Sequence, residues 1–165
     1  CGTWHCAAVV LVPPSGAGGY LYTWGCGYHG QLALGNRQVQ PKPGIVGAFL
    51  DTQQLLQSVH CGSHHCAAVT IEGELYTWGS NKNNCLGRTL VDEKTIFTPE
   101  PGHVGCFGVL VDGIGRGFPR SVSCGKEFTL VATYPYEGPS MEVAVQLMEE
   151  MALAEEEILL QDQEE

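Results

Sequence analysis

The chain has 165 residues, of which 44% are hydrophobic and 16% are charged, and 22 are glycine. This composition is that of a globular protein with a sizeable core, and it excludes collagen, a wholly disordered chain and a membrane protein. The many glycines and few charges favour tight turns and short strands over charged helix surfaces.

The formal net charge of -10 is concentrated at the C-terminal end of the chain. Residues 140–165 hold nine acidic residues and no Lys or Arg, which leaves nine acidic and eight basic residues in the rest. Because neither part offers a basic stripe, we expect no direct binding to nucleic acid or to an anionic membrane.

The eight cysteines are spread through a chain that is long enough to fold without disulfides. We therefore expect reduced thiols and a cytoplasmic location, with a nuclear location as the alternative. The sequence shows no signal-peptide pattern and no apolar run long enough for a membrane helix. Since the chain begins at Cys1, we expect it to be a piece of a longer protein.

Two short elements repeat along the chain in the same order. Cys1–Val9 (CGTWHCAAV) returns as Cys61–Val69 (CGSHHCAAV) and, more loosely, as Cys124–Val131 (CGKEFTLV), at spacings of 60 and 63 residues. The second element, Leu21–Gly25 (LYTWG), returns as Leu75–Gly79. Two unrelated elements that recur in one order indicate a repeat protein.

Each repeat is predicted to be a small antiparallel sheet. In the second repeat, Ala67–Ile71 is expected to be a strand, Glu72–Gly73 a two-residue turn and Glu74–Trp78 the partner strand. In the Gly-rich turn that follows, Asn84 occupies the position of Gly30, which predicts a positive φ at both. Short strands with glycine at fixed corners are typical of a propeller blade.

The first repeat carries six more residues between its Cys and its Trp than the second. This difference places an insertion at Val12–Gly19. We expect the insertion to project from a hairpin and to be a candidate recognition loop.

The sequence from Val59 to Gly79, followed in the first repeat by the turn GQLALG, resembles the repeat of the regulator of chromosome condensation family. The resemblance covers Cys1 to about Thr133 and implies a seven-bladed β-propeller with blades of four antiparallel strands. Two Trp-Gly and three Cys-Gly elements suffice for about two and a half blades. The expected fold class is all-β, an incomplete propeller over residues 1–133.

Residues 60–66 (HCGSHHC) have the residue types of a zinc site at close spacing. However, Cys61 and His65 recur as Cys1 and His5, so we expect them to be structural positions of the repeat. His65 is expected to hydrogen-bond backbone at the blade corner, and the other two histidines to lie on loop or solvent faces. No bound metal is predicted.

No sequence pattern for a catalytic nucleophile or a phosphate-binding loop is present. Gly113–Gly117 is rich in glycine, but it lies between predicted strands and lacks the helix N-terminus that phosphate binding uses. Trp24 and Trp78 recur once per repeat and are expected to pack between blades. We therefore predict no catalytic residues, no cofactor and no enzymatic activity.

After a predicted linker at 134–139, residues 140–165 are expected to form an acidic amphipathic helix or the start of a coiled coil. Its apolar positions are spaced three and four residues apart, as in a seam of about two heptads: Ala144, Leu147, Met151, Ala154 and Ile158. So short a seam is marginal alone. It is either a linker helix that docks on the propeller or a contact with a basic or neutral partner helix, made through Leu147, Met151 and Ile158.

The function that these patterns favour is a protein–protein interaction module, a propeller scaffold within a larger multidomain protein. The alternative is a guanine-nucleotide exchange factor, since the family that the repeats resemble includes exchange factors for small GTPases as well as modules of ubiquitin ligases, protein kinases and ciliary proteins. The expected partners are proteins, with a small GTPase under the alternative.

Overall fold

The computed structural model describes residues 1–13, 16, 18–88, 90, 96–105, 110–111, 114–115 and 119–133. Strands make up most of this part of the chain: β1 (His5–Leu11), β2 (Gly19–Gly25), β3 (Gln40–Ile45), β4 (Leu56–Cys61), β5 (His65–Thr70), β6 (Leu75–Ser80), β7 (Phe97–His103), β8 (Leu110–Val111), β9 (Ile114–Gly115), β10 (Pro119–Cys124) and β11 (Thr129–Thr133). The helical segments are α1 (Gly47–Asp51) and the 3-10 turn η1 (Lys82–Asn84).

The predicted linker at 134–139 and the predicted acidic helix at 140–165 lie outside the described residues. Among the residues that are described, no helix has the length and apolar character needed to span a bilayer.

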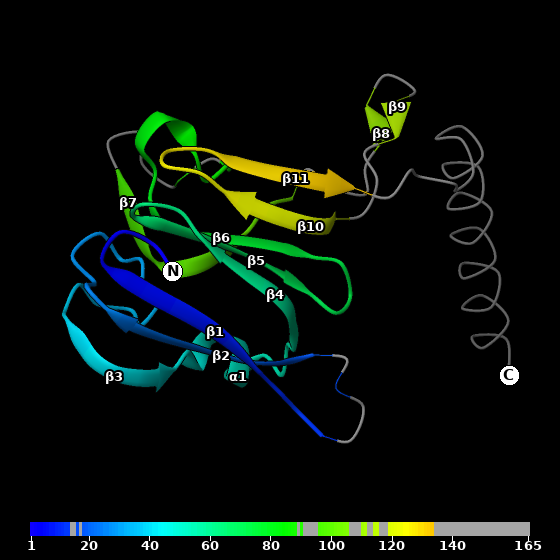
Figure 1. The fold of residues 1–165 in the computed structure, drawn as a ribbon. Coiled ribbons are helices and arrows are strands. Elements are labelled where there is room, and N and C mark those ends of the chain that lie inside the picture. Colours follow the sequence, from blue (N-terminus) through cyan, green and yellow to red (C-terminus); the bar gives the residue numbers. More distant parts are fainter. Residues whose placement is uncertain are drawn as a thin grey trace, which may run out of the picture.

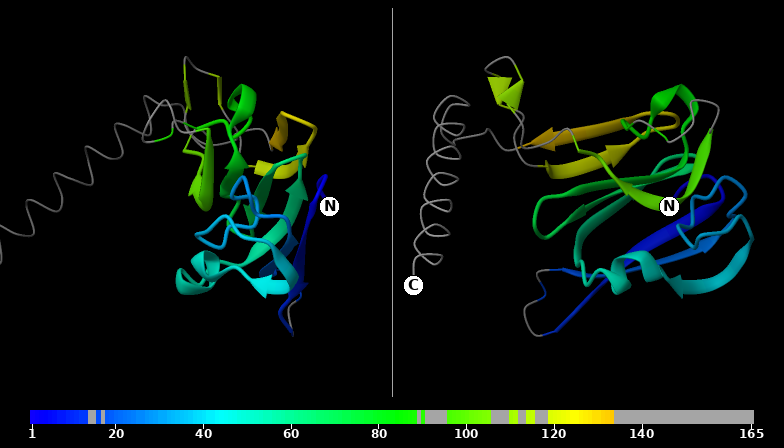
Figure 2. Two further views of the ribbon diagram at one scale, coloured as in Figure 1. Left: turned by 90° about the vertical axis from the view of Figure 1, so that its left-hand side faces the viewer. Right: turned by 180° about the vertical axis from the view of Figure 1, so that it is seen from behind.

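The strands pair with their neighbours along the chain, and all the pairs are antiparallel. β1, β2 and β3 form one group, and β4, β5, β6 and β7 form a four-stranded meander that a single residue pair, Gly19 with Leu56, joins to β2. β10 pairs with β11, and β8 pairs with β9. Figure 1 shows β1–β3, β4–β7 and β10–β11 as successive layers, and the two views in Figure 2 show the same stacking.

The predicted hairpin of the second repeat is confirmed as β5 and β6, and the first repeat uses the same register. His65 lies opposite Gly79, just as His5 lies opposite Gly25. The insertion of the first repeat lengthens β1 and β2 to seven residues each, against six in β5 and β6. Residues 14, 15 and 17 of the insertion lie outside the described residues.

The Gly-rich turns after β2 and β6 share one backbone conformation. Gly30 has a φ of 76° and Asn84 a φ of 55°, which confirms the predicted positive φ at this position. Three residues further along, Ala33 has a φ of 56° and Gly87 a φ of 63°. The chain thus keeps the turn even where the sequence supplies Ala or Asn instead of Gly, and tertiary packing offsets the local cost.

The core lies between the layers rather than within one sheet. One buried cluster joins β1–β3 and α1 to the meander: Leu21, Ala33, Val46, Phe49, Leu56, Cys66, Ala68 and Trp78. A second cluster lies on the other face of the meander: Ala67, Val69, Leu75, Val104 and Val122. Alternate residues of β5 therefore serve two different cores.

The short helix α1 is an element that the sequence patterns did not predict. It brings the buried ring of Phe49 into the first cluster, where its centroid lies 5.2 Å from the ring of Tyr76 and 6.1 Å from that of Trp78. Five residues are too few to show a helical period, so the helix depends on this packing.

Candidate functional site

The Cys-Gly turn that opens each repeat is built in the same way three times. The amide of Gly2 donates to the carbonyl of His5, that of Gly62 to His65, and that of Gly125 to Phe128, at 2.8, 2.8 and 2.9 Å. At each of these glycines a Cβ atom would collide with the ring of the residue three positions ahead. The glycine is therefore required because the ring lies against the backbone of the turn.

We call the contact between the first and second repeats the first seam. Across it, Nε2 of the buried His5 is hydrogen-bonded to Sγ of the buried Cys66 at 3.0 Å. The thiol of Cys66 donates to the carbonyl oxygen of Gln31 at 3.6 Å, and Nε1 of Trp78 donates to the same oxygen at 3.0 Å. One carbonyl of the first repeat thus holds two side chains of the second.

The second seam, between the second and third repeats, uses the same positions with a different side chain. Nε2 of His65 is hydrogen-bonded to Oγ1 of Thr129 at 3.0 Å. The Thr129 hydroxyl donates to the carbonyl oxygen of Cys85 at 2.8 Å, as Cys66 donates to Gln31. The backbone hydrogen bond expected for His65 is made with Phe128, whereas the contact with Thr129, 64 residues away in the chain, was not predicted.

His5, Cys61 and Cys66 form a compact group that we call the thiol cluster, in which the three ligand atoms lie within 4.8 Å of one another. A structural zinc site uses four protein ligands. At the second seam the hydroxyl of Thr129 occupies the place of the Cys66 thiol. The same contact between repeats therefore forms where a hydroxyl replaces one of the two thiols. The packing of one repeat on the next therefore accounts for the short distances within the thiol cluster. The expectation that these thiols bind no metal stays a prediction.

The thiols differ strongly in acidity. The hydrogen bonds of Cys66 and His5 to Cys61 hold the pKa of the Cys61 thiol well below its ordinary value, although burial opposes them. Burial, together with the neighbouring Cys61, raises the pKa of Cys66. Burial raises the pKa of Cys85 and of Cys124 to about 11. Cys61 is therefore the thiol of this group that ionises most readily.

The three Cys-Gly turns surround an open hollow of about 450 Å³. Its lining is Cys1, Gly2, Thr3, Cys61, Gly62, Ser63, Cys124, Gly125 and Lys126, three residues from each repeat. The backbone continues the contact between the turns, because the amide of Thr3 donates to the carbonyl of Ser63 at 3.3 Å and that of Ser63 to Lys126 at 3.3 Å. The half-buried Cys61 thus lies beside solvent-accessible space.

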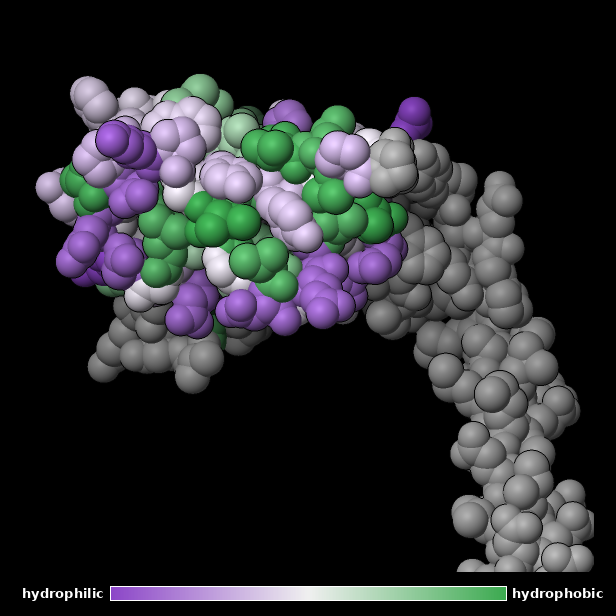
Figure 3. Space-filling model, turned by 90° about the horizontal axis from the view of Figure 1, so that it is seen from below, coloured by the Kyte–Doolittle hydropathy of each residue, from purple (hydrophilic) through white to green (hydrophobic). Residues whose placement is uncertain are grey.

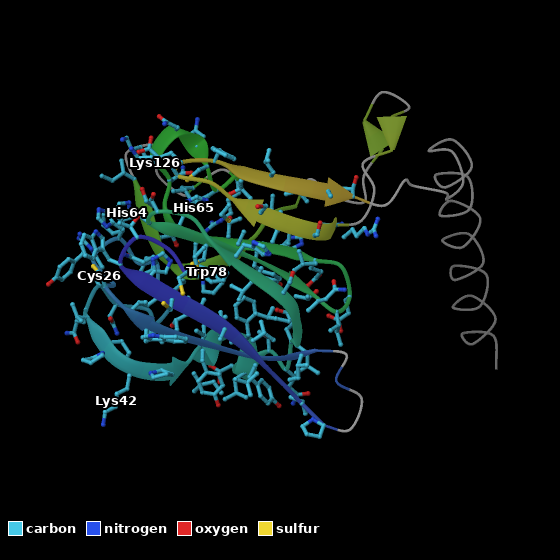
Figure 4. All side chains as sticks on the ribbon, viewed as in Figure 1. Cys26, Lys42, His64, His65, Trp78 and Lys126 are labelled. Atoms are coloured by element: carbon cyan, nitrogen blue, oxygen red, sulfur yellow. The ribbon has the colours of Figure 1, made fainter. Side chains whose placement is uncertain are left out.

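A second concave feature, which we call the groove, has a volume of about 480 Å³ and lies where loops of the first two repeats meet. It is lined by Trp4, Cys26, Tyr28, His29, Val39 and His64. The rings of His29 and His64 contact each other across the first seam at a centroid distance of 4.7 Å. Figure 4 shows His64 and Cys26 at the same end of the strands, with Trp78 deeper between the layers.

The histidines and tryptophans that the sequence analysis named lie in different places in the structure. His64 lines the groove, and His60 is exposed on β4. Trp78 packs between the layers as expected, whereas Trp24 is only half-buried. The predicted partner contacts Leu147, Met151 and Ile158 lie outside the described residues, as does most of Gly113–Gly117.

The comparison of the chain with known families identifies its repeats. The regulator of chromosome condensation (RCC1) repeat matches residues 18–69 and 72–132, and a second form of that repeat matches residues 57–85. The chain belongs to the RCC1 repeat family. The matched residues include the strands β4, β5 and β6 and the side chains of the second seam.

Proteins with very different names are similar in sequence to part of this chain. The E3 ubiquitin-protein ligase HERC2 of Homo sapiens is 40% identical over 82 residues, which are 48% of this chain and 2% of HERC2. The ultraviolet-B receptor UVR8 of Arabidopsis thaliana is 38% identical over 95 residues, 58% of this chain and 21% of the receptor. The secretion-regulating guanine nucleotide exchange factor of Bos taurus is 31% identical over 121 residues, 68% of this chain and 22% of that protein.

Solved structures of RCC1-type proteins share the fold. Human WBSCR16 superposes with a TM-score of 0.59 at 26% identity, over 82% of this chain and 30% of its own. Prp20p from Saccharomyces cerevisiae, whose structure is described with its binding to Gsp1p and histones, gives a TM-score of 0.56 at 20% identity over 81% of this chain. The chain spans less than a third of the length of each of these relatives.

Proposed function

We propose that this chain is part of an RCC1-type propeller that recognises proteins, within a longer protein. The groove carries the proposal, because its side chains do not follow the repeat. Trp4 corresponds to His64 in the second repeat and to Glu127 in the third. Residues that hold an RCC1-type scaffold together recur from repeat to repeat, and residues that differ at one exposed place are free to specify a partner.

The chemistry of the groove suits a protein side chain. Trp4 is 69% exposed and Tyr28 is 57% exposed, and Val39 adds a third exposed apolar surface. Aromatic residues that lie exposed beside histidines are typical anchors of protein interfaces, where the apolar centre is ringed by polar groups. The partner that fits is therefore an apolar or aromatic side chain with hydrogen-bonding groups beside it.

The groove is tested by comparing three forms of the complete protein in proximity labelling in cells. The double variant Trp4→Ala, Tyr28→Ala is expected to lose the partners that depend on the groove. The control is Ile96→Ala, which removes an equally exposed apolar side chain outside the groove and is expected to retain them. If the double variant keeps every partner of the wild type, the groove is not the recognition surface.

Guanine-nucleotide exchange on a small GTPase is the second candidate, supported by the similarity to the secretion-regulating exchange factor. Such an activity requires only binding that favours the nucleotide-free GTPase, so it needs no catalytic side chain in this chain. Release of a fluorescent guanine nucleotide from purified small GTPases, with and without the complete protein, tests it. Unchanged release rates across the GTPases would leave recognition as the function.

The C-terminal segment offers a separate contact that the sequence alone supports. We propose that Leu147, Met151 and Ile158 bind a basic or neutral helix of a partner. Leu147→Asp is then expected to abolish binding of the partner, because it places a charge among the apolar positions of the predicted helix. Added salt is expected to weaken binding by screening the acidic residues. Leu153→Asp changes a residue outside the apolar positions of the predicted helix and is the control. Retention of all partners by Leu147→Asp would reduce this segment to a linker.

A further inference from the structure

Cys61 and Cys66 are placed for a disulfide across two strands. They are directly opposite each other in the antiparallel pair of β4 and β5, and their Sγ atoms lie within 4.8 Å of each other. Opposite residues of such pairs have Cα atoms about 4.5–5.5 Å apart, inside the range of about 4.4–6.8 Å that disulfides span. Closing the bond therefore requires rotation of the two side chains and little movement of the backbone.

The first repeat has an equivalent pair of cysteines, and the third repeat does not. The corresponding thiols of the first repeat, Cys1 and Cys6, have their Sγ atoms 2.9 Å apart. In the third repeat Thr129 lies where Cys66 lies in the second, and its hydroxyl is 4.0 Å from Sγ of Cys124. Two repeats thus carry a thiol pair at this position, and the third carries a Cys–Thr pair that cannot be oxidised to a disulfide.

The two thiols of the pair have different exposure. Cys61 is half-buried and lines the open hollow, whereas Cys66 is fully buried beside His5. The low pKa of Cys61 supplies the thiolate that reacts with oxidants, and the Cys66 sulfur lies within 4.8 Å of it. A solvent-accessible attacking thiol with a resolving thiol beside it is the arrangement of redox-sensing cysteines, and the half-buried Cys61 reaches solvent through the open hollow.

We propose that Cys61 and Cys66 form a reversible disulfide when the protein meets a hydroperoxide, and that this disulfide loosens the first seam. The Cys61 thiolate attacks one peroxide oxygen, the O–O bond breaks, and the departing hydroxide takes up a proton to leave as water. The Cys66 thiol then attacks Sγ of the resulting sulfenic acid; the S–S bond forms, and the S–O bond breaks to release hydroxide, which takes up the Cys66 proton and leaves as water. Two thiols are oxidised by two electrons, and one hydrogen peroxide is reduced to two waters.

The consequence follows from the bonds that Cys66 makes across the seam. Its thiol donates to the carbonyl of Gln31 and is bonded to Nε2 of His5, and a disulfide sulfur has no proton to donate. His5 is 2% exposed and its Nδ1 atom already lacks a partner in the described structure. Oxidation would leave the ring buried with both nitrogens poorly paired, which disfavours the closed seam.

The disulfide is tested on the complete protein, treated with hydrogen peroxide and then with a thiol-blocking reagent. Trypsin releases residues 38–82, which contain Cys61 and Cys66 and no other cysteine. The peptide is expected to become lighter by two hydrogens and unreactive to the reagent, and to regain both thiols with dithiothreitol. Before oxidation, Cys61 is expected to be alkylated about tenfold faster than Cys124 at neutral pH.

The loosening is tested by hydrogen exchange of β1 and β5 in the oxidised protein. Exchange is expected to be faster after oxidation in the wild type and unchanged in Cys66→Thr, which installs the side chain that Thr129 shows to be compatible with a seam. Cys61→Ser, which keeps the contacts of Cys66, is the second resistant variant. It serves if Cys66→Thr does not fold.

Three results would overturn the proposal. The first is a peptide that keeps both thiols while Cys85 or Cys124 is oxidised. The second is a disulfide that forms without any change in exchange at β1 and β5, which would remove the link to the seam. The third is one zinc ion per chain in native mass spectrometry that is lost in Cys61→Ser, which would assign the thiol cluster to metal binding.

Discussion

The middle repeat and the two repeats beside it place equivalent side chains in opposite environments. All six residues of β5 are buried, whereas β1 and β11 contain half-buried and exposed residues at the corresponding positions. Ala67 of β5 is fully buried, and Leu130, at the same position of the third repeat, is 62% exposed. The more apolar residue is the exposed one, so neighbouring repeats, not hydrophobicity, decide burial here.

The outer faces of this stack consequently expose apolar side chains. Figure 3 shows apolar side chains gathered among hydrophilic ones on the face seen from below. The exposed residues of β1, β3 and α1 include Val10, Ile45 and Leu50, and Phe128 and Leu130 are exposed in the third repeat. Further repeats of the same kind would cover such faces, which is how repeat arrays bury a continuous core.

The largest loss of stability is expected when residues 1–165 are produced without any further repeats. Residues 1–165 expressed alone should be poorly soluble or loosely folded, because both end faces then meet water. Gel filtration and hydrogen exchange measure this. A monomer that unfolds cooperatively and protects both β2 and β6 would show that the stack is stable without further repeats.

A smaller but still large difference is expected between two tryptophans of the same motif. Trp78→Ala removes a fully buried indole and its bond to Gln31, and should destabilise its layer by about 3–5 kcal/mol. If the complete protein leaves Trp24 half-buried as here, Trp24→Ala should cost less. Urea titrations of both variants in the complete protein provide the measurement. Equal losses would indicate that further repeats cover Trp24 as fully as Trp78.

Acid should weaken the second seam through His65. Burial lowers the pKa of this histidine below its ordinary 6.5, so the folded protein binds fewer protons than the unfolded chain as pH falls through that value. The free energy of unfolding therefore decreases from neutral pH downward. In urea titrations at each pH, His65→Gln should lose less stability on acidification than the wild type. An unchanged pH profile would show that His65 does not titrate in this way.

The smallest effect is expected from the ion pair of the second seam. Nζ of Lys82 lies 2.7 Å from Oε1 of Glu127, and Lys82 is largely exposed, whereas Tyr28 and His64 occupy the corresponding positions at the first seam. Salt should weaken the pair by screening it. Lys82→Met should remove this salt dependence and leave the unfolding midpoint almost unchanged. A clear loss of stability in Lys82→Met would mean that the pair matters more than its exposure indicates.

Sequence patterns predicted the elements that depend on neighbouring residues in the chain. The hairpin of β5 and β6, the equivalent hairpin of the first repeat and the positive φ of Asn84 all follow from turn chemistry and strand periodicity over a few residues. The motif of Val59–Gly79 likewise carries the resemblance to the RCC1 family. The groove gave no such signal, because its lining comes from three separate loops.

By itself, then, the sequence determined the repeats, their strands and their family, since each repeat folds on local rules that its own residues carry. Only the tertiary structure decided which equivalent residues are buried, that α1 forms around Phe49, and that His5 meets Cys66 and His65 meets Thr129. The two histidine contacts join side chains more than sixty residues apart that become neighbours when one repeat stacks on the next. The contacts of the Cys66 thiol with His5 and with the carbonyl of Gln31 belong to that stacking, and no single repeat contains them.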